Sequence, residues 1–284
     1  MEKHIDVRPS SLAGRWYPAN PKQLAESVDS FIDKATIPDI PGEIIGVISP
    51  HAGHIYSGPV AGYCFAALQN TDPDLVVILS PFHQFDANPI LTTAHQAYQT
   101  PLGDVIVDLD NIQRIDSELK EKAGFNLKKI KNDDEHSVEI LLPFFQRALS
   151  GEFKILPLML RSQEPEIMKV LASILAELLK QEKVLLTAST DLSHFFPAEK
   201  AMMLDEEIIN HIKTLDPEGL YQVQEQGQGA ACGIGAIAAV MWAAKEAGPV
   251  TAHHLNYSHS GDITGDLGSV VGYTAAVITR DQVK

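Results

Sequence analysis

The sequence contains few cysteines and no long apolar segment. Only two of its 284 residues are cysteine, Cys64 and Cys232, so a disulfide framework is excluded and a reducing cytoplasm is predicted. The longest weakly polar run, residues 229–244, consists mostly of Ala and Gly and falls short of the roughly 20 apolar residues that a membrane span needs. The opening segment, MEKHIDVRPSSLAG, has neither the basic nor the apolar stretch of a signal peptide. We therefore expect a cytoplasmic protein with no membrane contact and a buried helix at residues 229–244.

Basic residues and standard catalytic motifs are also scarce. The chain has 22 Lys and Arg against 37 Asp and Glu, and the resulting net charge of −15 repels nucleic-acid phosphates. We interpret the acidity as a solubility feature and expect no nucleic-acid partner. The motifs GxGxxG, HExxH, CxxC, GxSxG and the P-loop are absent, so nothing supports a classical nucleotide-binding, zincin or α/β-hydrolase function.

Apolar patterning predicts the elements of the fold. Short continuous apolar runs indicate strands buried on both faces, and apolar residues spaced at i, i+3 and i+4 indicate helices. Strands are expected at residues 44–48, 75–79, 153–160, 184–188, 250–257 and 269–279, the last two around a Gly-rich loop at 261–268, and helices at 21–35, 58–69, 137–149, 165–181 and 201–215. This order predicts an α/β fold in which residues 1–284 form a single domain, with a largely parallel central sheet flanked by helices.

Three of the expected strands lead directly into polar segments that contain histidine. His51 follows the first strand and His83 the second, while Asp191 and His194 follow the strand at 184–188. If these strands are parallel neighbours, their carboxyl ends share one edge of the sheet, and the four side chains converge on one crevice. Such a group either holds a divalent transition metal or supplies a general base with its orienting partner.

The two cysteines call for different interpretations. Cys232 follows a Gly-rich segment and precedes a helix, where the backbone dipole would stabilise a thiolate and small neighbours would admit a ligand. The alternative for Cys232 is a small buried apolar residue, and that is the interpretation we prefer for Cys64.

The acidic segment at residues 133–139 has two interpretations. Its carboxylates can cap the helix that follows. Alternatively, Glu135, His136 or Glu139 forms hydrogen bonds to ligating histidines.

Six motifs, in this order along the chain, resemble those of the Memo family. They are AGRWYP at 13–18, SPHAG at 49–53, SPFH at 80–83, EHSVE at 135–139, DLSH at 191–194 and CG at 232–233. The resemblance implies a fold similar to class III extradiol ring-cleavage dioxygenases, which bind non-haem Fe(II) through two histidines and a glutamate. It further implies His51, His83 and Cys232 as metal ligands, and His194 as an acid/base with Asp191 beside it. Because a thiolate replaces the carboxylate, the site is softer than that of a ring-cleavage enzyme, and we expect iron or copper in preference to zinc.

The resemblance also implies partners. Eukaryotic Memo proteins resemble adaptors that bind phosphotyrosine peptides, and prokaryotic relatives accompany an AMMECR-type protein and a radical-SAM enzyme. Three functions follow for this chain: a metal-dependent oxidoreductase acting on an unknown small molecule, a non-enzymatic metal- or peptide-binding module, and a hydrolase or transferase with Cys232 as nucleophile.

Overall fold

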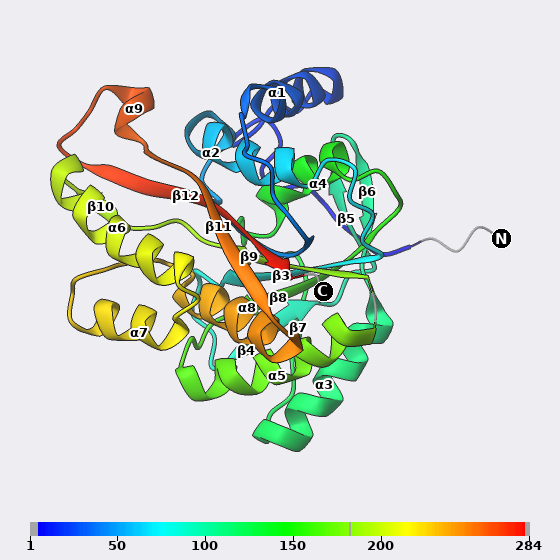
Figure 1. The fold of residues 1–284 in the computed structure, drawn as a ribbon. Helices are drawn as coiled ribbons and strands as arrows, with labels where there is room; N and C mark the ends of the chain where they lie inside the picture. Colours follow the sequence, from blue (N-terminus) through cyan, green and yellow to red (C-terminus); the bar gives the residue numbers. More distant parts are fainter. Residues whose placement is uncertain (1–4, 182, 282–284) are drawn as a thin grey trace.

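A nine-stranded mixed β-sheet forms the centre of the computed structural model, which describes residues 5–181 and 183–281 (Figure 1). Its strands are β2 (Glu43–Ser49), β3 (Leu75–Pro81), β4 (Ile90–Thr93), β7 (Lys128–Ile130), β8 (Lys154–Leu160), β9 (Val184–Ser189), β10 (His194–Phe196), β11 (Val250–His259) and β12 (Val270–Arg280). The order across the sheet is β10-β12-β2-β9-β3-β8-β4-β7, and β11 also pairs with β12. All six predicted strands are present, at nearly the predicted positions.

Parallel pairing is confined mainly to the middle of this sheet. Strands β2, β9, β3 and β8 are parallel neighbours, so their carboxyl ends lie at one edge. Strand β12 is antiparallel to β2, β10 and β11, and β4 is antiparallel to β8. The prediction of a largely parallel sheet is therefore not confirmed for the sheet as a whole, because apolar runs reveal burial without revealing strand direction.

Helices cover both faces of the sheet (Figure 1). Helices α1 (Pro21–Lys34), α2 (His54–Ala67) and α4 (Leu142–Ala148) pack together on one side, and α3 (Leu109–Ala123), α5 (Pro165–Gln181) and α8 (Ile234–Ala247) on the other. Helix α6 (Ala198–Lys213) packs against β11 and β12, and α7 (Pro217–Glu225) lies between α6 and α8. The helix predicted at 137–149 is interrupted: a 3-10 turn, η1 (Glu139–Leu141), precedes α4, and Pro143 lies in the first turn of α4.

A second, three-stranded sheet lies beside the first and was not predicted. It consists of β1 (Val7–Arg8), β5 (Ala97–Thr100) and β6 (Gly103–Ile106). β1 pairs parallel with β5, which brings Arg8 opposite Tyr98. The Gly-rich loop predicted at 261–268 contains the short helix α9 (Gly261–Thr264).

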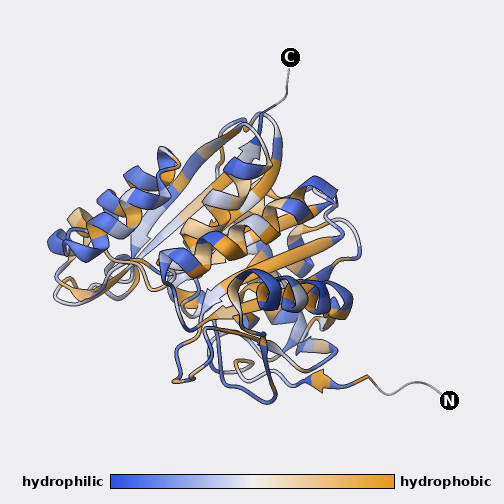
Figure 2. Ribbon diagram, turned by 90° about the horizontal axis from the view of Figure 1, so that it is seen from below, coloured by the Kyte–Doolittle hydropathy of each residue, from blue (hydrophilic) through white to orange (hydrophobic). Residues whose placement is uncertain are grey.

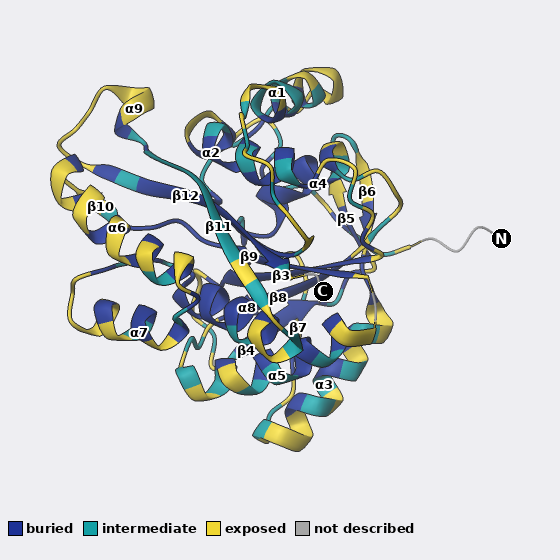
Figure 3. Cartoon of the chain, viewed as in Figure 1, coloured by how far each residue is buried: buried dark blue, intermediate teal, exposed yellow. Residues whose placement is uncertain are grey.

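The core lies between the helices and the central sheet. Every residue of β3 and β9 is buried, and the colouring in Figures 2 and 3 shows apolar, buried strands beneath helices whose outer surfaces are polar and exposed. Over the described residues, none of the helices combines the length and the apolarity required to cross a membrane. The buried strands of the sheet thus support the polar loops at its carboxyl edge.

Candidate metal centre

The carboxyl ends of β2 and β3 bring two histidines together, and a loop adds a third. His51 follows β2, His83 follows β3, and His136 comes from the loop between β7 and η1. One ligand nitrogen from each ring lies within 4.8 Å of the others, which is the spacing of a group that can share one metal ion. We call His51, His83 and His136 the histidine cluster. His51 is buried, His136 is partly buried and His83 is exposed.

The tautomer of His51 follows from its hydrogen bonds. Its Nδ1 lies 2.9 Å from Oγ of Ser189, whose hydroxyl donates to the carbonyl of Ser137 at 2.6 Å. Since the only hydroxyl proton of Ser189 is used in this way, Ser189 must accept from Nδ1–H of His51. Burial and the neighbouring histidines lower the pKa of His51 well below its ordinary value, so the ring is neutral. Nε2 of His51 therefore carries the lone pair of the ring, and it faces Sγ of Cys232 at 3.3 Å.

Glu135 orients His83 in the same manner. The carboxylate accepts from Nδ1 of His83 at 2.9 Å and from its backbone N–H at 2.7 Å. It also accepts from the backbone N–H groups of His136 and Ser137 and from Oγ of Ser137. Although burial opposes the change, these bonds lower the pKa of Glu135 to about 2. Glu135 is thus a fixed carboxylate that holds Nδ1 of His83 and, although burial opposes the change, raises the pKa of that histidine above its ordinary value. Nε2 is the nitrogen of His83 that Glu135 leaves uncontacted.

His136 and Glu139 do not lie where residues that form hydrogen bonds to ligating histidines would be expected. The ring of His136 lies 4.5 Å from that of His83 and 5.3 Å from that of His51, measured between centroids, and burial lowers its pKa to about 4. It belongs to the histidine cluster itself. Glu139 bonds Arg8, Ser10, Ser11 and Tyr17. Of Glu135, His136 and Glu139, only Glu135 forms the hydrogen bond to a cluster histidine that the sequence hypothesis describes.

Cys232 lies beside the histidine cluster. Its Sγ is 3.3 Å from Nε2 of His51 and accepts the backbone N–H of Asp191 at 3.2 Å. Cys232 precedes α8 by two residues, yet burial and the Asp191 carboxylate raise the pKa of the thiol to about 12. Burial and the nearby carboxylate therefore oppose the thiolate that a helix N-terminus would favour. Cys64 is buried between β2 and β12, which agrees with its interpretation as a small buried apolar residue.

Asp191 and His194 lie at the same edge without contacting each other through their side chains. Oδ1 of Asp191 accepts the backbone N–H of His51 at 2.8 Å, and burial raises the pKa of Asp191 to about 7. Nδ1 of His194 donates to the carbonyl of Leu192 at 2.8 Å. The expectation that Asp191 orients His194 is not met in this arrangement, since the Leu192 carbonyl does so and Asp191 holds the His51 backbone.

A cavity of about 670 Å³ opens over these groups. Its polar lining includes the three cluster histidines, Asp191 and His194. Trp16, Tyr56 and Phe195 provide an aromatic lining, and the Phe195 side chain is 75% exposed. The φ of Phe195 is 64°, a left-handed conformation that is unfavourable for an aromatic residue and is typical of constrained functional loops.

Sequence reasoning missed two members of this arrangement. Ser189 ends β9 and Ser137 lies in the acidic segment, and the sequence pattern assigns neither of them a role at the site. His136 was considered only as a hydrogen-bond partner, since it does not follow a strand. The signal that could have found it is its position next to Glu135 in EHSVE, one of the six ordered motifs.

Known proteins resemble this chain in both fold and sequence. A crystal structure described as an uncharacterized protein JW3007 from Escherichia coli K12 superposes with a TM-score of 0.55 at 16% identity, covering 84% of this chain and 100% of that one, which shows the fold alone. A "MEMO1 family protein" of Nitrosopumilus maritimus is 37% identical, with 95% of this chain and 98% of the relative covered. Another from Saccharolobus solfataricus is 35% identical over 94% and 97% of the two chains. The sequence model described as "Memo-like protein" matches residues 8–277. The chain therefore belongs to the Memo family.

Proposed function

We propose that this protein holds an iron or copper ion at the histidine cluster and carries out metal-dependent redox chemistry on a small molecule bound in the adjoining cavity. The observation that carries the proposal is the pair of fixed tautomers. Ser189 and Glu135 each accept from an Nδ1–H, so Nε2 is the atom of His51 and of His83 that would bind a metal. At His83 the metal would displace the proton that the raised pKa favours. Bound iron or copper would supply the redox chemistry, which the side chains present lack.

The donor groups fit such a metal. Imidazole nitrogens bind iron, copper and zinc, and a thiolate shifts the preference toward softer metals. His51 and His83 would be two of the ligands. The third would be Cys232, as the family resemblance implies, or His136, which the geometry of the cluster favours. The Cys232 thiol already contacts Nε2 of His51, so a metal ion placed between them would replace the thiol proton.

The remaining polar groups would serve the ligand in the cavity. His194 lines the cavity and its Nδ1 is held by Leu192, so Nε2 is the atom that would accept or donate a proton. Asp191 would keep the His51 backbone in place. The aromatic lining would exclude water from one side of the ligand. The similarity to class III extradiol dioxygenases stays a proposal that rests on the family resemblance.

A binding module without turnover is the second candidate. It is favoured by the breadth of the aromatic lining, since the exposed Phe195 and Tyr56 could contact a ligand larger than a small substrate, such as a peptide. The third hypothesis, a cysteine nucleophile, has less support because the pKa of Cys232 is raised to about 12. The AMMECR-type protein and the radical-SAM enzyme remain proposed partners on the family resemblance.

Metal analysis of protein purified without a His-tag, with and without oxygen, tests the proposal. We expect near-stoichiometric iron or copper in the unmodified protein and none in His51→Ala. Comparing Cys232→Ser with His136→Gln then identifies the third ligand, because only the variant that lacks a ligand loses affinity. Protein that carries no metal and binds none below micromolar concentration would overturn the proposal. Metal binding without oxygen consumption on any oxidisable compound would favour the binding module.

A further inference from the structure

Arg8 is a buried cation outside the cavity. It lies on β1 in the small sheet, its side chain is 1% exposed, and its guanidinium lies 4.9 Å from the ring centroid of Tyr98 on β5. A guanidinium so deeply buried is stable only when its donors are paired with good geometry. Its partners therefore indicate what it holds in place.

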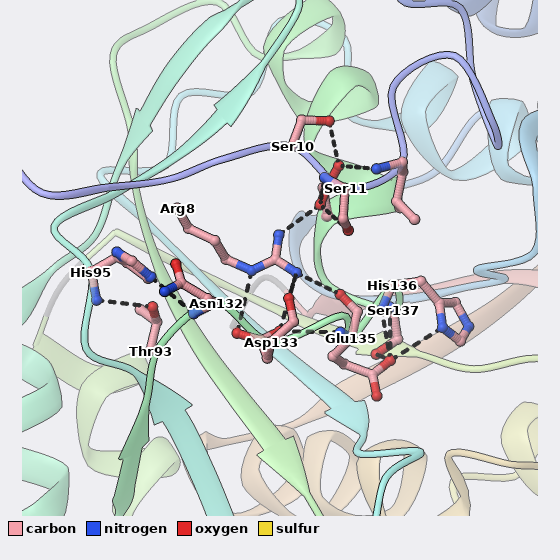
Figure 4. Close-up of polar contacts among 12 residues, drawn as sticks. Arg8, Ser10, Ser11, Thr93, His95, Asn132, Asp133, Glu135, His136 and Ser137 are labelled. Carbon is pink, nitrogen blue, oxygen red and sulfur yellow. Dashed lines mark hydrogen bonds and ion pairs between the residues drawn. The ribbon is translucent and has the colours of Figure 1, made fainter.

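Those partners lie mainly on the loop at residues 133–137, as Figure 4 shows. Nη2 of Arg8 donates to the backbone carbonyls of Asp133 at 2.9 Å and of Glu135 at 3.0 Å. The same nitrogen forms an ion pair with Oδ1 of Asp133 at 3.1 Å. Nε of Arg8 also donates to Oδ2 of Asp133 at 3.3 Å. One planar guanidinium thus binds this loop through two of its nitrogens, which fixes the path of the loop backbone.

The other side of the guanidinium reaches Glu139. Nη1 of Arg8 forms an ion pair with Oε2 of Glu139 at 2.6 Å, and both side chains are buried. Glu139 also accepts from the hydroxyls of Ser10 and Tyr17, each at 2.7 Å. This carboxylate therefore connects the segment at residues 10–17 with the loop and with Arg8.

The loop that Arg8 holds carries groups that orient the histidine cluster. Glu135 accepts from Nδ1 of His83, His136 is itself a cluster member, and the carbonyl of Ser137 accepts from Ser189, which in turn binds His51. We propose that Arg8 is a positioning residue of the metal centre. It fixes the loop so that Glu135 remains bonded to His83. The metal-binding part of this inference rests on the proposed function, whereas the orientation of His83 does not.

The test compares Arg8→Lys with Tyr17→Phe. A lysine keeps the charge but has no planar fork, so it cannot bind two carbonyls and two carboxylates together. Tyr17→Phe removes one hydrogen bond from Glu139 and leaves the contacts of Arg8 with the loop intact, which makes it the matched control. The first readout, in metal-free protein, is the NMR signal and water-exchange rate of the His83 Nδ1 proton, assigned with His83→Gln. The second is the dissociation constant for Co²⁺.

In Arg8→Lys we expect the His83 proton to exchange at least tenfold faster and the Co²⁺ dissociation constant to rise tenfold or more, as is usual when the support of a metal ligand is removed. The His194 Nδ1 proton, bonded to Leu192, should keep its exchange rate and thereby report an intact fold. In Tyr17→Phe both quantities should stay within about twofold of the original, because the bonds of Arg8 to the loop carbonyls remain.

An unchanged His83 proton in Arg8→Lys would overturn the inference. If the original protein bound no Co²⁺, the proposed function would fail, and the His83 comparison would still decide the role of Arg8. Should Arg8→Lys lose the His194 signal, and hence its fold, Asp133→Asn takes its place. That variant removes the charge of Asp133 and one of the two carboxylate oxygens that accept from Arg8. An exchange rate of His83 equal to the original would then contradict the inference.

Discussion

Replacing Ser189 by alanine should damage both stability and metal affinity. The hydroxyl of Ser189 accepts from Nδ1–H of His51 at 2.9 Å and donates to the carbonyl of Ser137 at 2.6 Å. Alanine leaves both of these buried groups without a partner, at about 1–3 kcal/mol for each. We therefore expect a loss of roughly 2–6 kcal/mol, or about 3–10 °C in Tm. Because the tautomer of His51 is no longer fixed, the dissociation constant for Fe²⁺ should rise about 10- to 100-fold.

Ser80→Ala is the matched control. Ser80 lies near the end of β3, next to β9, and is as buried as Ser189, but its hydroxyl has no hydrogen-bond partner within the described part of the chain. Removing an unpaired buried hydroxyl should leave Tm unchanged or raise it. Thermal unfolding and anaerobic Fe²⁺ titration of the two variants provide the comparison. Equal effects of the two substitutions, or no effect of Ser189→Ala, would refute the assigned role of Ser189.

Three further predictions concern packing, pH and metal removal. Gly62→Ala should lower the free energy of unfolding by about 3 kcal/mol, because the added Cβ would lie 2.3 Å from the backbone oxygen of Phe31. Gly53→Ala is the control for a Tm measurement and should be near neutral, since the nearest atom to its Cβ would be 3.6 Å away. Although burial opposes it, the bonds of Glu139 hold its pKa below the usual value, so it stabilises the fold above about pH 4.5 and less as pH falls. The stability advantage over Glu139→Gln should therefore shrink between pH 5 and 3 in denaturant titrations; a constant difference would contradict this. Metal at 100 times its dissociation constant should stabilise the protein by about 2.7 kcal/mol, and a chelator should abolish this shift in Tm.

Much of the central sheet could be predicted from sequence because burial leaves a direct pattern. The apolar runs that become β2, β3 and β9 end where polar residues begin, and this placed His51, His83 and Asp191 at strand ends. Parallel neighbours share an edge, so their convergence required no further information. The direction of β12 could not be predicted, since its apolar residues would suit either orientation.

The missed parts of the site depend on contacts distant in sequence. His136 is placed by a loop that Arg8 binds from 125 or more residues away, and β1 contains only two residues, too few for any pattern. Helix α3 was also missed, although Asp108 caps its start and Gly124 adopts the left-handed conformation at its end. Those two signals were available, whereas the path of the loop was not.

The most direct test of the central claim is an anaerobic titration of the metal-free protein with Fe²⁺ and Cu⁺, beside His51→Ala and Ser80→Ala. The account predicts one ion bound per chain with submicromolar affinity in the original protein and in Ser80→Ala, and no binding in His51→Ala. Equal binding by His51→Ala, or none by the original protein, would contradict the assignment of the histidine cluster as a metal centre.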